Sequence, residues 1–231
     1  MKNQIKVNLF IIFFNISVFG ICQNNFNQNG LREGVWLGYH ENGKMKFKGH
    51  FKNGKETGVF NYYDLLGNKV IELNYIEPGV TCSAVLFYSN GVIQSQGTYQ
   101  NQLKDSLWIF FNQDGEKIAE ENYKMGNLNG HCVYFQDGLK SEMYTFLNGE
   151  KNGVSNIYYQ SGYISMSSHY LNNLLHGKAT FYFNNNNMNI ETEGLFYKGL
   201  KDSIWKSYNI DGDIINIELY NKGKLIDSNQ E

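Results

Sequence analysis

The sequence predicts an all-β protein: an elongated, twisted antiparallel meander of about eight β-hairpin repeats that forms a single-layer or half-tubular open sheet. Three observations predict this fold. A unit of about 24 residues recurs along most of the 231-residue chain. Turn pairs containing glycine punctuate each unit, and the composition, with 16% aromatic residues, 24 glycines and one proline, is typical of strands and turns. No stretch has the sustained 3.6-residue apolar period of a helix.

The first full copy of the unit, residues 34–55, reads GVWLGYHENGKMKFKGHFKNGK. Residues 34–39 are predicted to form one strand. Asn42-Gly43 predicts a type I′ turn, because both central residues of such a turn need positive φ. Phe47, Gly49 and Phe51 alternate through a second strand, and residues 53–54 turn the chain again.

The repeat can be counted from the aromatic residue that lies eight positions after each turn glycine. These aromatics are Phe51, Tyr75, Tyr99, Tyr123, Phe146, Tyr170, Phe196 and Tyr220, and the turn glycines are Gly43, Gly67, Gly91, Gly115, Gly138, Gly162 and Gly212. Copies begin at Gly34, Gly58, Cys82, Ser106, Gly130, Gly153, Gly177 and Ser203. The seventh copy has Asn184 to Asn187 and Met188 in place of its turn glycine. A fixed period of this length marks a solenoid, propeller or array.

The chain is thereby divided into four parts: a signal peptide (1–22), an N-terminal cap (23–33), the repeat array (34–225) and a polar tail (226–231). Lys2 and Lys6 precede an apolar run over residues 7–21, with Gly20 and Cys22 at the −3 and −1 positions of a cleavage site. We therefore expect export to the periplasm, the cell surface or the medium. A retained anchor is an alternative, although the run is short of the roughly 20 apolar residues that span a bilayer. A lipoprotein acylated at Cys22 is a further alternative, with Ile21 larger than the Gly or Ala usual before such a cysteine.

Charge and cysteine content restrict the partners and the cross-links. Without residues 1–22 the chain has 18 basic residues against 22 acidic ones, a net charge near −4. Nucleic acid and anionic lipid both demand a basic surface, so neither is expected as the main partner. Cys82 and Cys132 lie about four strands apart, or roughly 19 Å at the usual strand spacing. Because a disulfide needs Cα atoms within about 7 Å, both thiols are predicted to be free.

Two rows of aromatic residues are the candidate site. Period-2 spacing places Trp36, Phe60, Trp108, Cys132 and Trp205 on one face of their strands. The aromatics eight residues after the turn glycines form a second row, and we expect the two rows to line the same face. One interpretation makes the rows the core of the sheet. The other leaves part of the face open as a groove for a peptide, glycan or partner domain. Both interpretations stay open at this point.

No catalytic, cofactor-binding or metal-ligating constellation is found, so no enzymatic activity is predicted. None of the five histidines has metal-ligand spacing, although His40 and His50 lie on the two strands of one hairpin. Neighbouring Glu120 and Glu121 point to opposite faces of a strand. Glu191 and Glu193 share a face, but no nucleophile or base accompanies them.

The pattern G-x-W-x-x-Y-x-x-N-G-K followed by G-x-F-x-N-G-K resembles the MORN repeat, in its bacterial variant found in antitoxin-like proteins. Gly34, Trp36, Tyr39, Asn42-Gly43-Lys44, Gly49, Phe51 and residues 53–55 carry the match, which extends from about residue 30 to 224. Copies three, four and eight begin without glycine, and we expect local distortion there and at Met188. The resemblance implies a non-enzymatic protein-protein interaction module or scaffold. It also implies two alternatives, an antitoxin or immunity component of a toxin system and a structural spacer of the cell envelope.

Overall fold

The computed structural model describes residues 23–230, so the predicted signal peptide and Cys22 lie outside the described residues. The described chain consists of strands and turns, and none of it forms a helix able to cross a membrane. The strands are β1 (Asn25–Phe26), β2 (Arg32–Tyr39), β3 (Met45–Lys52), β4 (Lys55–Tyr63), β5 (Lys69–Glu77), β6 (Thr81–Phe87), β7 (Ile93–Gln100), β8 (Leu103–Phe111), β9 (Lys117–Lys124), β10 (Asn127–Leu128), β11 (Gly130–Gln136), β12 (Leu139–Leu147), β13 (Glu150–Tyr158), β14 (Ile164–Leu171), β15 (Leu174–Leu175), β16 (Gly177–Tyr182), β17 (Ile190–Tyr197), β18 (Leu200–Tyr208), β19 (Ile214–Asn221) and β20 (Lys224–Gln230).

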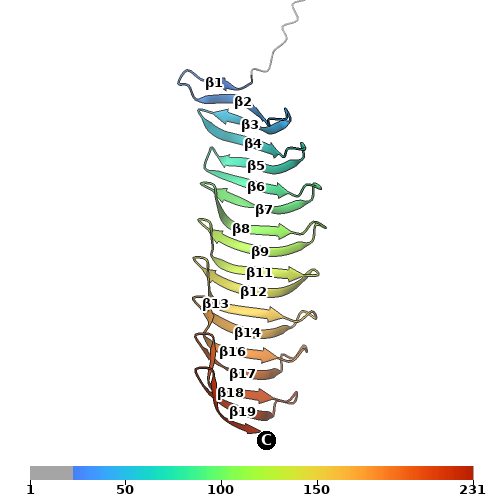
Figure 1. Ribbon diagram of the computed structural model, residues 1–231, viewed down its shortest axis with the longest axis vertical. Helices are drawn as coiled ribbons and strands as arrows, with labels where there is room; N and C mark the ends of the chain where they lie inside the picture. The colour runs from blue at the N-terminus through green and yellow to red at the C-terminus, as the bar shows by residue number, and fades with distance from the viewer. Residues whose placement is uncertain (1–22, 231) are drawn as a thin grey trace, which may run out of the picture.

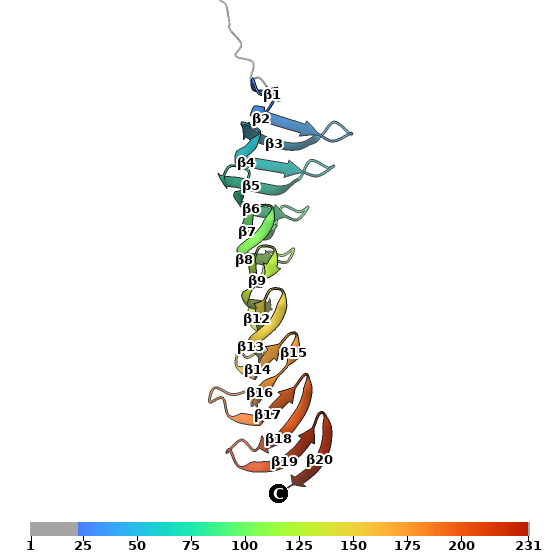
Figure 2. The same ribbon diagram turned by 90° about the vertical axis from the view of Figure 1, so that its left-hand side faces the viewer.

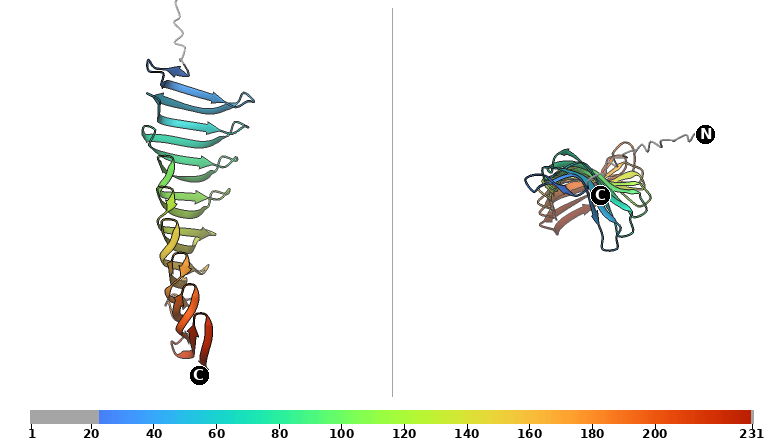
Figure 3. Two further views of the ribbon diagram at one scale, coloured as in Figure 1. Left: turned by 60° about the vertical axis from the view of Figure 1, so that its left-hand side comes forward. Right: turned by 90° about the horizontal axis from the view of Figure 1, so that it is seen from above.

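Each strand pairs antiparallel with the next in the chain, which gives a single open meander as predicted (Figure 1). The short strands β10 and β15 are the first parts of the strands that continue as β11 and β16, since β9 pairs with both β10 and β11, and β14 with both β15 and β16. The sheet is one layer thick and twists continuously along its length, so that the strands fan out when it is seen from above (Figures 2 and 3).

Two kinds of turn alternate along the sheet. The turn between copies uses residues 53–54, both at positive φ (49° and 78°), as a type I′ turn requires. The turn within copy one differs from the prediction. Only Gly43 has positive φ (81°), and its N–H donates to the carbonyl of His40 at 2.9 Å. This is a type I turn followed by a glycine bulge, which needs one left-handed residue instead of two.

The turn within each copy varies in length, and this variation accounts for the irregular steps of the repeat. Copy five is one residue shorter because Asp137 and Gly138 form a two-residue turn, both at positive φ, between Gln136 and Leu139. Copy seven is two residues longer because its turn closes with a hydrogen bond from the N–H of Phe183 to the carbonyl of Asn189. Met188 there has a φ of 55° and takes the left-handed position of the missing glycine.

The copies that begin without glycine behave in two ways. Ser106 and Ser203 keep the left-handed backbone of the glycines they replace, with φ of 59° and 60°. Each serine hydroxyl donates to the carboxylate of the preceding aspartate, at 2.9 Å and 3.1 Å. Cys82 does not adopt positive φ, and the irregularity in pairing moves to the facing strand, between Tyr75 and Glu77. Of the three copies that begin without glycine, only copy three has an altered backbone at its start.

The two ends of the sheet are strand edges. At one end β1 pairs with β2 as a short cap, joined by a turn at residues 27–30. At the other end β20 pairs with β19 as far as Gln230, so residues 226–230 of the expected polar tail continue the sheet. Cys82 and Cys132 are both buried free thiols, which confirms the prediction that they form no disulfide.

Candidate functional site

The pairing register places the two aromatic rows on the same face of the sheet, which we call the inner face. In copy one, Trp36 pairs with Gly49 and Gly34 pairs with Phe51. Directly paired residues share a face, as do residues two apart in one strand. Trp36 and Phe51 therefore lie side by side, with ring centroids 5.8 Å apart in an edge-to-face arrangement.

The third residue of each copy forms the core of this face. These residues are Trp36, Phe60, Ala84, Trp108, Cys132, Ser155, Ala179 and Trp205, and all but the half-buried Trp36 are at most 4% exposed. The three tryptophan indoles each donate an N–H to a backbone carbonyl of the preceding strand, at 3.0–3.1 Å. The third-position aromatics thus serve as core.

The large core residues lie over glycines of the preceding strand. A Cβ added at Gly49, Gly97 or Gly194 would stand 2.1–2.4 Å from the ring of Phe60, Trp108 or Trp205 respectively. Where the equivalent residue is instead large, as Leu73, Glu121 and Tyr144 are, the next third-position residue is small: Ala84, Cys132 and Ser155. Each strand therefore fits the volume of its neighbour, which keeps the single layer closely packed.

The eighth-position aromatics are less buried than the core row. Phe51 and Phe146 are buried, at 3% and 8% exposure, whereas Tyr75, Tyr99, Tyr123, Tyr170, Phe196 and Tyr220 are half-buried. No second layer covers them within the described residues. The inner face therefore has a partly accessible aromatic ring in copies two to four and six to eight.

Basic side chains lie against these rings in four copies, always from the residue two positions before the copy start. Arg32 Cζ lies 4.7 Å from the ring centre of Trp36 and 5.0 Å from that of Phe51. Lys104 Nζ is 4.7 Å from the ring centre of Trp108 and 4.9 Å from that of Tyr123. We call the space that such a side chain fills a cation seat, since the face of an aromatic ring attracts a cation.

The same seat recurs towards the C-terminus. Lys151 Nζ lies 3.1 Å from the ring centre of Tyr144, and Lys201 Nζ lies 4.4 Å from that of Trp205. Carboxylates accompany these lysines, since Lys201 is 3.6 Å from Glu218. Burial among the rings lowers the pKa of Lys104 and Lys151, and the nearby carboxylates Glu121 and Glu142 partly offset this.

The seat of copy two holds a carboxylate instead of a cation. Glu56 occupies the position two residues before Gly58, pairs with Phe51, and is half-buried on the inner face. It faces a cleft of about 360 Å³, lined by tyrosines 62, 75 and 99 and by Val80 and Cys82. In copy three Val80 stands at the position that a long basic side chain occupies in copies one, four, six and eight, and this shorter side chain leaves the space unfilled.

Polar groups in this cleft are free of partners within residues 23–230. The hydroxyls of Tyr62, Tyr75 and Tyr99 make no hydrogen bond, and the Glu56 carboxylate forms no ion pair there. By contrast, the hydroxyl of Tyr123 donates to Glu121 at 2.6 Å. Burial, followed by the charge of Glu56, raises the pKa of Tyr62 and Tyr75. Burial also raises the pKa of the Cys82 thiol, which keeps it protonated and unreactive at neutral pH.

Sequence reasoning found the aromatic rows but missed the cation seats. The signal was present as a basic residue two positions before the start of copies one, four, six and eight. It was hidden because the repeat was defined by its glycines and aromatics, and because surface lysines and arginines carry little pattern information of their own.

The other residues considered from the sequence are engaged in separate contacts. His40 Nε2 is 2.8 Å from the carbonyl oxygen of Tyr63, and His50 Nδ1 is 3.0 Å from the Thr57 hydroxyl. Within the described part of the chain no group of three or more potential ligands could hold a metal ion. The seven turn glycines have φ between 77° and 94° and lie in the turns within their copies.

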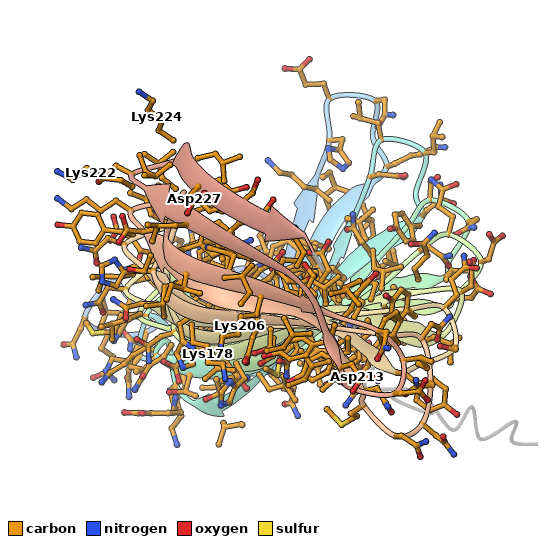
Figure 4. All side chains as sticks on the ribbon, turned by 90° about the horizontal axis from the view of Figure 1, so that it is seen from below. Lys178, Lys206, Asp213, Lys222, Lys224 and Asp227 are labelled. Atoms are coloured by element: carbon orange, nitrogen blue, oxygen red, sulfur yellow. The ribbon has the colours of Figure 1, made fainter. Side chains whose placement is uncertain are left out.

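The opposite, outer face carries mixed polar and apolar side chains. Near the C-terminal end Lys178 and Lys206 lie close together on one side of the sheet (Figure 4). Lys178 pairs with Glu193 at 2.8 Å, and the hydroxyl of Tyr208 donates to the same carboxylate at 2.9 Å. These contacts, the lysine hydrogen bond above all, hold the pKa of Glu193 below its usual value. Glu193 is therefore occupied by neighbours, and Glu191 is exposed.

The chain was compared with curated proteins and with solved structures. No curated protein matches the sequence. Among solved structures, a crystal structure of TarM is similar over 40% of this chain and 20% of its own, with 14% identity and a TM-score of 0.30. A mutant of S. aureus TarM in complex with Fondaparinux, alpha-GlcNAc-glycerol and UDP matches over 41% of this chain and 19% of its own, with 12% identity and a TM-score of 0.32. The chain spans about a fifth of the length of either protein, and likenesses this weak carry no argument about fold or function.

The sequence itself gives the more informative match. The family described as the MORN repeat variant matches residues 32–53 and 84–101, which correspond to most of copy one and part of copy three. The remaining copies share the antiparallel strand pairing of these two. The resemblance of this chain to the MORN-repeat family is thereby confirmed.

Proposed function

We propose that this chain is a non-enzymatic, exported MORN-repeat protein that binds another protein through its inner face. One observation carries the proposal: six half-buried aromatic rings, one from each of six copies, lie on one face of a single-layer sheet, with no second layer over them in residues 23–230. Apolar rings that remain partly accessible on one face of a sheet support an interaction site there. The half-buried tyrosines suit a protein partner, because each offers a large apolar ring together with a polar hydroxyl.

Site-specific photo-crosslinking tests which face binds. A benzophenone side chain placed at Tyr123 on the inner face should yield an adduct with one envelope or secreted protein, and the same protein should be captured from Tyr170. The matched control is Val59, an outer-face residue with 48% exposure, which should yield no such adduct. Failure of both inner-face positions, or capture of the same protein from Val59, would contradict the proposal.

Export has its own test, because it concerns residues outside those the structure describes. Mass spectrometry after cell fractionation should find a chain that starts at Gln23 in the periplasm, envelope or medium. An intact Met1 in the cytosol would count against export and favour an antitoxin or immunity role.

A structural spacer is the second candidate, and the elongated form of the sheet, with strand edges only at its ends, favours it (Figure 1). For a spacer, deletion of two copies should abolish function while Tyr99→Ser and Tyr123→Ser leave it intact. For a binding module, the single substitutions should already impair function.

A further inference from the structure

The cleft at copies two and three is a cation seat whose internal cation is missing. In copies one, four, six and eight a basic side chain of the chain itself lies 3.1–5.3 Å from the inner-face ring centres. At the same position copies three, five and seven have the apolar residues Val80, Leu128 and Leu175, and copy two has the acidic Glu56. The surrounding aromatic groups are retained in Tyr62, Tyr75 and Tyr99. The ring environment for a cation is therefore present, and the space is open.

We propose that this cleft binds the ε-ammonium group of a lysine side chain presented by a protein partner. The proposal deepens the proposed function and rests on it for the identity of the ligand as part of a protein. A lysine ammonium is then the group by which the inner face recognises its partner at this cleft.

The charges in the cleft select a cation. The Glu56 carboxylate is half-buried and has no ion-pair partner among the described residues. A half-buried carboxylate is stabilised by an opposite charge, and the electron-rich faces of tyrosines attract the same charge. An anionic ligand would meet repulsion from both.

The hydrogen-bonding groups favour an ammonium over a guanidinium. An ammonium has three donors around one nitrogen, whereas a guanidinium is a planar fork that suits bidentate carboxylates. The cleft is lined by Glu56 and by three tyrosines whose hydroxyls make no hydrogen bond within residues 23–230, so that both kinds of acceptor are available to the three donors of an ammonium. Leu73, Val80 and Cys82 supply an apolar wall for the alkyl stem.

The size of the cleft fits one side chain. Its volume, about 360 Å³, is at the lower end of the roughly 300–1,000 Å³ typical of ligand pockets. Lys104, in the next seat along, shows the arrangement that the ligand would reproduce, with its ammonium between the rings of Trp108 and Tyr123 and near Glu121.

NMR titration of the full chain with Nα-acetyl-lysine amide tests the seat without any knowledge of the partner. The ring signals of tyrosines 62, 75 and 99 should shift saturably, whereas the apolar analogue Nα-acetyl-norleucine amide should not shift them. Glu56→Gln, which keeps the shape of the side chain, should weaken binding about tenfold or more, as expected for a charge-assisted contact. The effect should diminish at high salt.

Two variants complete the test. Glu56→Lys places the chain's own ammonium in the seat and should abolish binding. Glu72→Gln removes a carboxylate from the outer face of the same hairpin, where it pairs with Lys69 at 2.8 Å, and should leave binding unchanged. Circular dichroism establishes that each variant is folded.

Equal shifts with lysine and norleucine amides, tighter binding of the corresponding arginine amide, or unaltered binding by Glu56→Gln would each overturn the proposal. The photo-crosslinking experiment separates the two levels. A captured partner together with an inert cleft would leave the proposed function standing and remove the lysine seat. A lysine-binding cleft without any captured partner would leave the lysine seat standing and remove the proposed function.

Discussion

Copies three and four fill the same space beneath the inner face in opposite ways. Copy four places Trp108 over Gly97 of the preceding strand and covers the ring with Lys104. Copy three has Ala84 next to Leu73, with Val80 where the base would stand. The core is filled in both copies, but only copy four supplies a cation. The difference teaches that neighbouring strands are matched sterically as pairs, while the cation seats vary independently and can be left open for a ligand.

Alkaline pH should have the largest effect, because it acts on the tyrosine-rich copies two to six together. Burial raises the pKa of Tyr75, Tyr123, Tyr134 and Tyr144 above the ordinary value of about 10. Above that pH the unfolded chain releases protons that the folded chain retains, so the free energy of unfolding falls as pH rises. Tyrosinate absorbance should therefore appear together with loss of the β-sheet circular dichroism signal. Full tyrosinate absorbance from an intact sheet would contradict the burial of these hydroxyls.

Trp108→Ala should be the most damaging single substitution considered for copy four. It removes a side chain with 0% exposure and its indole hydrogen bond to the carbonyl of Thr98. Loss of a buried tryptophan costs about 3–5 kcal/mol. Denaturant unfolding with local hydrogen exchange would show the loss concentrated in β7–β9, because a repeat array couples mainly to its nearest neighbours. Ala84→Gly, the matched change in copy three, should cost much less.

Gly97→Ala tests the steric pairing directly. The added Cβ would stand 2.4 Å from Trp108, so the ring must move, at a cost of about 1–3 kcal/mol. In a Trp108→Ala background the same change should cost little or nothing. A double-mutant cycle measures this coupling, and additive effects of the two substitutions would refute the pairing of large residue with glycine.

Ser106→Gly should have the smallest effect and the opposite sign. Ser106 holds a φ of 59°, which costs a residue with a side chain about 1–2 kcal/mol, so glycine relieves strain. The lost hydrogen bond from the serine hydroxyl to Asp105 offsets part of the gain. Thermal unfolding should give a slightly raised Tm. Cys82→Gly, at the equivalent position without positive φ, should lower it, and a rise in both variants would contradict the difference between copies three and four.

The sequence predicted the meander, the repeat spacing and the free cysteines, because hydrophobic alternation and turn chemistry are local properties. It could not distinguish the type I′ turn from the glycine-bulge turn at Asn42-Gly43, since both favour the same residue pair. Nor did it predict that Ser106 would keep a left-handed backbone while Cys82 would not. That outcome depends on a hydrogen bond to Asp105 and on the pairing of the adjacent strand.

The sequence predicted the two aromatic rows of the candidate site but not the cation seats or the open cleft. Trp36 and Phe51 were expected on one face, and the register places them there. The open cleft depends on Glu56 in β4 and on Val80 in the turn before β6, each unremarkable alone. Their combination matters only once the register brings them together, which a single sequence does not specify.

The cation seats at Lys104, Lys151 and Lys201 are filled by the chain's own ammonium groups, whereas the seat at Glu56 is open. The most direct measurement is the ¹H–¹³C spectrum of the lysine ε-methylene groups, because stacked rings shift nearby protons strongly upfield. The wild-type chain should show upfield signals from these three lysines, besides those of Lys69 and Lys117, which lie over Phe87 and Phe135, and Glu56→Lys should add one more. Lysine signals that all remain at their exposed positions, or a variant that adds none upfield, would contradict the account.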